Sequence, residues 1–114
     1  MGLFDRFTRG RSSGPRSDAE SDARHLADWA HSHHGVEAYV EPQTTVTEVT
    51  VVLVAADGEW TRRKVGGERG ARRLGQELKI PVYDVRKTGY PQRMRDYDNR
   101  RRIERKRERQ RELD

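Results

Sequence analysis

The residues best suited to a defined chemistry are the arginines near the C-terminal end of the chain. Residues 86–114 contain twelve Lys and Arg against six Asp and Glu. An arginine side chain is a planar fork of hydrogen-bond donors that matches a phosphate group and stacks on nucleobases. Arginine-rich segments that become ordered on contact are also one way in which proteins bind RNA. We therefore predict nucleic-acid-binding residues in this segment, namely Arg93, Arg95, Arg100, Arg101, Arg102, Arg105 and Arg107.

The formal net charge of +5 is distributed unevenly along the chain. Residues 17–85 contain eight basic and twelve acidic side chains, so this part is net negative. All of the positive excess lies in residues 1–16 and 86–114. A basic protein favours polyanionic partners, and here only the two ends of the chain supply the positive charge. The glutamates at 104, 108 and 112 disfavour tight binding to duplex DNA, because they would face its phosphates with like charge.

A second interpretation of the arginine-rich segment is a solvated helix whose charges pair along its own surface and keep the protein soluble. Opposite charges three or four residues apart on a helix attract each other, and each pair contributes a few tenths of a kcal/mol. Such pairing would allow the helix to form without any core. The sequence offers three pairs at this spacing, which are Asp98–Arg102, Glu104–Arg107 and Glu108–Arg111.

Aromatic side chains offer a different chemistry, the anchoring of a partner protein. Trp60, Trp29 and Tyr39 are the candidates, because exposed aromatic residues supply much of the binding energy at protein interfaces. A protein–protein adaptor is therefore an alternative to a nucleic-acid-binding protein.

Histidines are the only residues that raise the question of a metal site. His25, His31, His33 and His34 cluster toward the end of the first predicted helix. Zinc sites need three or four ligands, and no carboxylate stands at a matching helical spacing with these histidines. Protonated histidines are favourable at the C-terminal end of a helix in any case. We predict no metal site here.

No arrangement typical of an enzyme can be assigned. The glycine-rich joint Val65–Gly70 could present helix amides to a phosphate, but its spacing differs from the dinucleotide-binding fingerprint G-x-G-x-x-G. A tight turn is the interpretation that this favours. The chain has no cysteine, which excludes disulfides, thiolate metal sites and thiol redox chemistry. The sequence therefore predicts no cofactor, and binding rather than catalysis.

The elements that must position these residues begin with a helix and a strand. Ser17 and Glu20 have the spacing of a capping box, which predicts a helix start at Ser17. Alanine and leucine then recur along one helical face, and Gly35 ends the helix. Residues 36–41 alternate between apolar and polar side chains, as in a half-buried strand, and Pro42 stops it.

A β-hairpin over residues 45–65 is the clearest structural signal in the chain. Asp57-Gly58 joins two strand-like runs, and this dipeptide favours the type I′ turn of a two-residue hairpin loop. Such a turn would place Leu53 opposite Arg62. The first strand is apolar on both faces, so we expect it in the interior of the sheet.

A second helix and a last strand follow the hairpin. Residues 68–78 have apolar positions at helical spacing, and residues 80–85 resemble a short strand. Because a strand–helix–strand unit with tight joints favours a crossover connection, we expect this strand to run parallel to an earlier one.

A last helix is predicted after Gly89. Tyr90, Met94 and Tyr97 lie on one face and can pin its first turns to the folded body. From Asp98 onward almost no apolar residue remains, so this part must project from the body.

Together these elements predict an α+β fold of one small domain with a sheet of about four mostly antiparallel strands, in the order α-β-β-β-α-β. The hydrophobic content is 32% and the charged content 38%, which predicts a compact domain with solvated extensions. We place a flexible basic arm at 1–16, the domain at 17–97 and a charged helical tail at 98–114. The arm contains an apolar cluster that could dock on a surface, consisting of Leu3, Phe4 and Phe7.

Three stretches resemble a family of short actinobacterial proteins. They are Val51–Arg63, Ile80–Val85 and Gly89–Tyr97, and the resemblance covers about residues 20–97. Most members of that family are uncharacterised, and some are labelled as oxidoreductases. The resemblance therefore implies a small oxidoreductase with an unidentified cofactor as a further alternative, but it implies no catalytic residue.

The sequence as a whole favours a non-enzymatic binding protein. We expect it to contact RNA or the ribosome through its arginine-rich C-terminal helix. No apolar run approaches the length of a membrane span, and the absence of cysteine fits a reducing cytoplasm.

Overall fold

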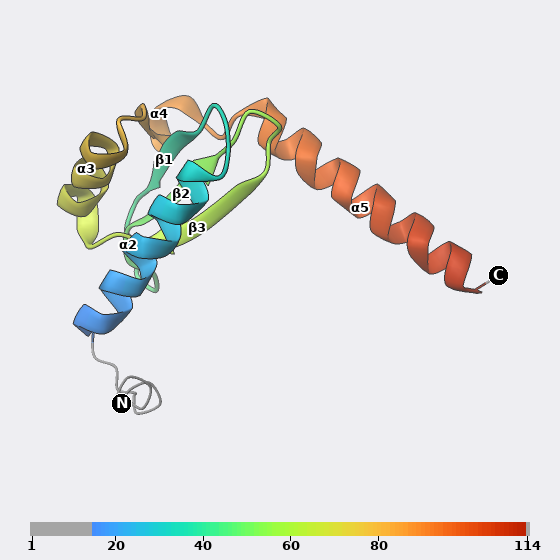
Figure 1. The fold of residues 1–114 in the computed structure, drawn as a ribbon, viewed down its shortest axis with the longest axis horizontal. Helices are drawn as coiled ribbons and strands as arrows, with labels where there is room; N and C mark the ends of the chain where they lie inside the picture. Colours follow the sequence, from blue (N-terminus) through green and yellow to red (C-terminus); the bar gives the residue numbers. More distant parts are fainter. Residues whose placement is uncertain (1–14, 114) are drawn as a thin grey trace.

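The computed structural model describes residues 15–113, and it has the predicted α+β architecture with a four-stranded sheet (Figure 1). The predicted arm lies outside the described residues except for its last two positions, which belong to the first helix. The elements in chain order are α2 (Pro15–His31), β1 (Glu37–Glu41), β2 (Thr50–Val54), β3 (Trp60–Lys64), α3 (Gly67–Leu78), β4 (Val82–Asp84), α4 (Val85–Thr88) and α5 (Gln92–Leu113).

The sheet is mixed, with the strand order β3-β2-β1-β4. The pairs β1–β2 and β2–β3 are antiparallel, whereas β4 runs parallel to β1. The prediction of a parallel last strand is therefore confirmed. The apolar strand β2 lies inside the sheet, as expected from its sequence, because strands pair with it on both sides.

Helices cover both faces of this sheet. Successive side chains of a strand point to opposite faces. On β2, Val51 and Leu53 pack in one core cluster with residues of α2 and α3. Val52 and Val54 face the other way and pack with Met94 of α5. The start of α5 is therefore part of the core, although the rest of that helix is not.

Helix α2 begins two residues before the predicted start. Proline is favoured in the first turn of a helix, where its missing N–H costs nothing, and Pro15 is the first residue of α2. Ser17 therefore lies inside the first turn, and the predicted helix start at this residue is wrong. The apolar face is placed as predicted, since Leu26 is completely buried. Gly35 follows the helix with φ of +62°.

The register of the predicted hairpin is wrong by one residue. Leu53 pairs with Thr61, not with Arg62. The loop has three residues instead of two: the Ala55 N–H donates to the Glu59 carbonyl at 2.8 Å, and the Gly58 N–H donates to the Ala55 carbonyl at 2.9 Å. Gly58 has φ of +94°, while no positive φ occurs at the preceding aspartate. This is a type I turn followed by a left-handed glycine, which the same sequence permits.

The chain between β4 and α5 contains one element that the sequence did not predict. The predicted strand 80–85 is shorter, because Val85 starts the one-turn helix α4. The Asp84 side chain accepts from the Arg86 backbone N–H at 2.8 Å and thereby caps this helix. Hydrogen bonds from the Arg86 side chain and then from its backbone lower the pKa of Asp84 to about 2.

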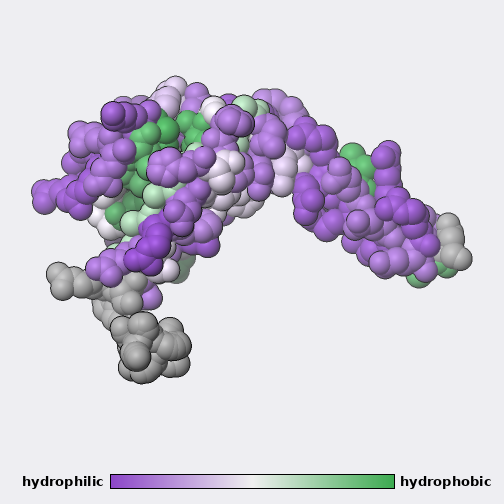
Figure 2. All heavy atoms as spheres, viewed as in Figure 1, coloured by the Kyte–Doolittle hydropathy of each residue, from purple (hydrophilic) through white to green (hydrophobic). Residues whose placement is uncertain are grey.

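Helix α5 starts on the body and then leaves it (Figure 1). Met94 is buried and Tyr90 and Tyr97 are half-buried, so the predicted pinning of the first turns is confirmed. Every described residue from Asp98 onward is exposed, and the projecting part is covered almost entirely with hydrophilic side chains (Figure 2).

Candidate nucleic-acid interface

Arg93 fixes the first turn of α5 to the body. Its Nε donates to the Ala55 carbonyl at 2.9 Å, and its guanidinium donates to Glu37 Oε1 at 2.7 Å. The hydrogen bond from Arg93 is the largest influence on Glu37 and holds the pKa of this carboxyl below its ordinary value. Arg93 was one of the predicted nucleic-acid-binding residues. Its Nε and one terminal nitrogen of its guanidinium donate within the fold and the residue is half-buried, so it does not belong to the exposed set.

The first part of α5 contacts the hairpin before the helix leaves the body. The Trp60 indole N–H donates to Asp98 Oδ1 at 2.8 Å. Two residues further along, the Arg100 guanidinium donates to the Asp57 carbonyl at 2.9 Å. Gly58 lies so close to the helix that a Cβ atom at this position would stand 2.1 Å from the Arg93 carbonyl oxygen. The position at which α5 leaves the body is therefore fixed by several contacts.

The predicted charge pairs of the tail do not form among the described residues. The single ion pair there is Arg101–Glu104, at 3.9 Å. Asp98, a predicted partner of Arg102, instead accepts from Trp60, and Arg102 donates to Asn99. The three pairs supported the solvated-helix interpretation, which stays an alternative, since the described tail is a fully exposed helix. The absence of these pairs within residues 15–113 leaves most guanidinium groups of the tail open to solvent.

Four cations form one continuous face of the projecting helix. Residues at positions i, i+3, i+4 and i+7 of a helix share a face. Arg102, Arg105, Lys106 and Arg109 have this spacing, and we call them the basic stripe. All four are exposed, and the stripe is about 10 Å long at 1.5 Å per residue. Lys106 and Arg109 were not among the predicted binding residues, although their spacing from Arg102 was the signal.

Of the glutamates of the tail, Glu104 lies across the helix from the basic stripe, whereas Glu108 and Glu112 follow Arg105 and Arg109 by three residues and so border it. Glu104, Glu108 and Glu112 are four residues apart, so they form their own row along the helix. The other predicted binding residues are placed elsewhere. Arg100 contacts the hairpin turn, and Arg95 donates to the Tyr90 carbonyl at 3.2 Å near the start of the helix. Arg101 pairs with a glutamate, and Arg107, seven residues after Arg100, lies outside the stripe.

A hollow of about 390 Å³ lies where the basic stripe meets the body. Two aromatic side chains, Trp60 and Tyr97, line it together with three arginines. The Arg62 guanidinium, which is paired with Glu41, lies over the Trp60 ring at 5.1 Å from its centre. The complete lining is Trp60, Tyr97, Asp98, Arg101, Arg102 and Arg105.

Two of the three predicted protein anchors are used within the fold. Tyr39 is 6% exposed and donates its hydroxyl to Glu37 at 2.9 Å. It is more buried than a half-buried strand predicts, because α5 covers the second face of the sheet. Trp29 stacks on His33 with ring centres 3.8 Å apart and packs against the core. Trp60 lines the hollow beside α5.

The histidines are separated by their local contacts. His25 Nε2 lies 2.7 Å from Thr61 Oγ1, and His33 Nε2 lies 3.1 Å from Glu59. The other two histidines are exposed. Within residues 15–113, no group of three His, Asp or Glu side chains is placed so that it could hold a metal ion.

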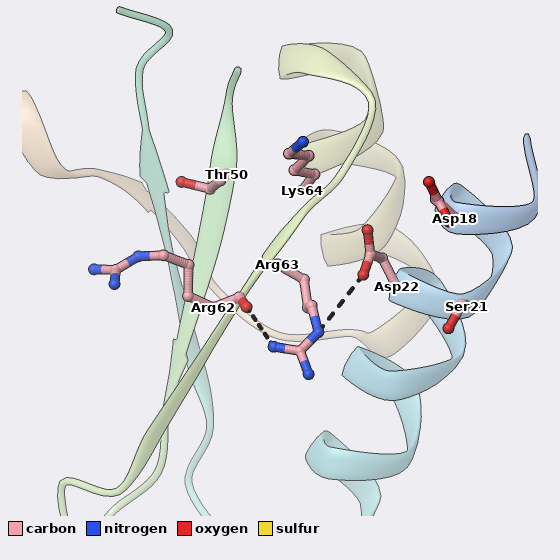
Figure 3. A pocket seen from close by; sticks show the side chains of 7 residues that line it. All are labelled: Asp18, Ser21, Asp22, Thr50, Arg62, Arg63 and Lys64. Carbon is pink, nitrogen blue, oxygen red and sulfur yellow. Dashed lines mark hydrogen bonds and ion pairs between the residues drawn. The ribbon is translucent and has the colours of Figure 1, made fainter. Parts of the chain in front are cut away.

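A second hollow, of about 410 Å³, lies between α2 and β3 (Figure 3). It contains basic side chains, but carboxylates neutralise them. Arg63 pairs with Asp22 at 3.5 Å, and Arg62 pairs with Glu41 at 2.7 Å. This hollow therefore offers a phosphate much less uncompensated charge than the basic stripe does.

Glu41 is the most heavily bonded carboxylate on that side of the sheet. It accepts two hydrogen bonds from Arg62, one from Thr50 and one from Tyr90. Burial acts to raise the pKa of Glu41, but these hydrogen bonds outweigh it and lower the pKa. The cluster links β1, β2 and β3 to the segment before α5, so its role is to hold elements together.

The glycine-rich joint before α3 is a tight turn. Gly66 and Gly67 both have positive φ, and no side chain caps the start of the helix. A Cβ atom on Gly70 would stand 1.6 Å from the Val65 carbonyl oxygen, so only glycine allows this close approach. The turn interpretation made from the sequence therefore agrees with the geometry.

Comparisons with known proteins add no relative: no family model, no curated protein and no solved structure matches the chain. The resemblance to short actinobacterial proteins stays a prediction. Among the described helices, none combines the length and the apolar character needed to cross a membrane.

Proposed function

We propose that the protein is a non-enzymatic, cytoplasmic RNA-binding protein that contacts RNA phosphates, including those of the ribosome, through the basic stripe of α5. One observation carries this proposal. Arg102, Arg105, Lys106 and Arg109 share one exposed face of a helix that leaves the body. Among residues 15–113, the last three have no ion pair or hydrogen bond that would neutralise them.

The charge of the body supports the same site. Residues 17–85 are net negative, so the body repels a polyanion while the tail attracts it. Glu108 and Glu112 border the basic stripe beside Arg105 and Arg109, so an RNA strand meets cations most directly from the side of Arg102 and Lys106.

The test is a pair of charge-neutralised variants that differ only in where the charge is lost. The stripe variant carries Arg102→Gln, Arg105→Gln, Lys106→Gln and Arg109→Gln. The control variant removes the same charge from exposed arginines of α2 and α3, namely Arg24→Gln, Arg69→Gln, Arg72→Gln and Arg73→Gln. Affinity for a labelled mixed RNA pool is measured at low salt by fluorescence anisotropy.

We expect the stripe variant to lose affinity by a factor of about 10 or more, because phosphate contacts supply most of the sequence-independent binding. The control variant should change affinity by a factor of less than about 3, since its arginines lie away from the contact. Equal affinities of the stripe variant and the unmodified protein would refute the proposal. Failure of the unmodified protein to bind RNA at low salt would refute it as well.

A further inference from the structure

We infer that the hollow between β3 and α5 binds an unpaired nucleobase against Trp60, so that the RNA recognised by the basic stripe is single-stranded. This inference rests on the proposed function and names the substrate class of the same site. Trp60 and Tyr97 supply aromatic surface, and Arg101, Arg102 and Arg105 surround it. A stacking platform beside phosphate-binding cations is the usual construction of a site for single-stranded nucleic acid.

The Trp60 ring is held in place for this role. Its indole N–H donates to Asp98 at 2.8 Å, which ties the ring to α5. The ring packs against the buried cluster of Tyr39, Val52, Val54 and Met94, and the Arg62 guanidinium lies over it at 5.1 Å from the ring centre. The ring is nevertheless only half-buried and lines the hollow. A fixed aromatic ring loses little conformational freedom when a base stacks on it, which favours binding.

The site can contact the phosphates and a base of the same strand at once. Arg102 and Arg105 belong both to the basic stripe and to the lining of the hollow. A strand that runs along the stripe therefore brings its phosphates to these two residues while one of its bases reaches Trp60. The bond to Trp60 also occupies one oxygen of Asp98, the one acidic residue of the lining.

Duplex RNA cannot make this contact without being opened. Its bases are stacked and paired. For this reason, proteins that recognise RNA bases do so mostly in single-stranded segments. A single strand offers free base faces at no such cost. The stripe alone would bind any polyanion, whereas the hollow adds binding only for a ligand that carries an exposed base.

The first experiment uses the fluorescence of Trp60. The chain has two tryptophans, so Trp29→Phe leaves Trp60 as the only one. This full-length variant is titrated with oligouridine, with duplex RNA of the same length and with heparin, a polyanion without bases. We expect saturable quenching with oligouridine and little change with heparin or duplex RNA, because a stacked base quenches the ring directly.

The second experiment measures affinity after Trp60→Leu and Trp60→Phe. Loss of one stacked base corresponds to a drop in oligouridine affinity by a factor of about 5 to 150. We expect the leucine variant to show this drop relative to its heparin affinity, and the phenylalanine variant to retain most of the preference. A thermal unfolding scan of each variant verifies that it is folded.

The outcomes separate this inference from the proposed function. Equal Trp60 quenching by heparin and oligouridine, or an unchanged ratio of the two affinities in Trp60→Leu, would overturn the inference while binding through the stripe still stands. If the leucine variant is unfolded, the fluorescence titration of Trp29→Phe decides by itself. If the protein binds none of the three polyanions, the proposed function is refuted instead.

Discussion

Helix α5 is divided into two regions that use similar residues for different purposes. In its first turns, Met94 is buried and Arg93 is bonded to Glu37 and Ala55. In its last four turns, Ile103 and Leu113 are exposed and the arginines lie in solvent. The backbone is the same regular helix throughout. What differs is whether the body offers a partner, and this difference separates arginines that hold the fold from arginines that can bind a ligand.

The comparison teaches that counting arginines does not locate a binding surface. Arg93 and Arg105 are identical in chemistry and twelve residues apart on one helix. Arg93 lies over the hairpin, where a carboxylate and carbonyl groups accept its hydrogen bonds. Arg105 has no such acceptor among the described residues and lines an open hollow. Position relative to the body therefore decides the role of each arginine.

The largest difference in unfolding free energy should come from a leucine-to-alanine substitution made once in the core and once in the projecting tail. Leu53 is completely buried, whereas Leu113 is 82% exposed. Leu53→Ala should lower the free energy of unfolding by about 2–5 kcal/mol, because it leaves a cavity in a packed core. Leu113→Ala should change it by less than about 0.5 kcal/mol. Urea denaturation measures both, and similar values for the two variants would show that the tail is not independent of the core.

The contact between α5 and the hairpin turn can be tested with two glycines that both have positive φ, +94° at Gly58 and +78° at Gly66. Gly58→Ala should destabilise the protein by more than about 2 kcal/mol, because the new methyl group adds a clash with the Arg93 carbonyl to the cost of the left-handed conformation. Gly66→Ala carries the conformational cost alone, about 1 kcal/mol, since nothing lies within 4 Å of its Cβ position. Equal losses in thermal or urea unfolding would refute the close contact.

The two roles of arginine should appear as different losses of stability. Arg93→Met should cost about 1–3 kcal/mol, because it removes hydrogen bonds to Glu37 and to the hairpin. Arg109→Met, on the exposed part of the same helix, should change stability by less than about 0.5 kcal/mol. Chemical denaturation of both variants provides the comparison. A larger loss for Arg109→Met would reverse the assignment of roles.

Protonation of Glu37 at acid pH should weaken the attachment of α5 to the body, because Arg93 donates to this carboxylate. The Arg93 hydrogen bond lowers the pKa of Glu37 from its ordinary value of 4.5 in the folded protein. A lowered carboxyl pKa contributes stability that is present above the ordinary value and lost as pH falls through the folded value. Unfolding free energy should therefore decline below about pH 4.5, and less steeply in Glu37→Gln. A Glu37→Gln profile parallel to that of the unmodified protein would exclude this contribution.

The order of elements could be predicted from the sequence because periodicity and turn residues specify it directly. The apolar run of β2 indicated an interior strand, and the joint between α3 and β4 indicated a parallel strand. The hairpin register could not be derived, since Asp57-Gly58 fits both a two-residue loop and the three-residue loop that occurs. The loop that occurs places Gly58 against α5, a contact between residues distant in sequence that no local pattern reveals.

The candidate site could be predicted only in part. The near absence of apolar residues after Asp98 correctly indicated a projecting helix. The roles of Arg93 and Tyr39 could not be derived, because both depend on Glu37 and on the way α5 crosses the sheet. The hollow at Trp60 was missed for the same reason, because the α5 residues that line it with Trp60 follow 37 or more positions later in the chain. Tertiary contacts of this kind leave no local pattern.

The most direct test of the account is the salt dependence of oligouridine binding by the unmodified protein, the stripe variant and the control variant. Each phosphate contact with a single strand contributes about 0.7 to the slope of log affinity against log salt concentration. If Arg102, Arg105, Lys106 and Arg109 make these contacts, the slope should become less steep by about 3 in the stripe variant and stay unchanged in the control. Equal slopes for the stripe variant and the unmodified protein would contradict the account.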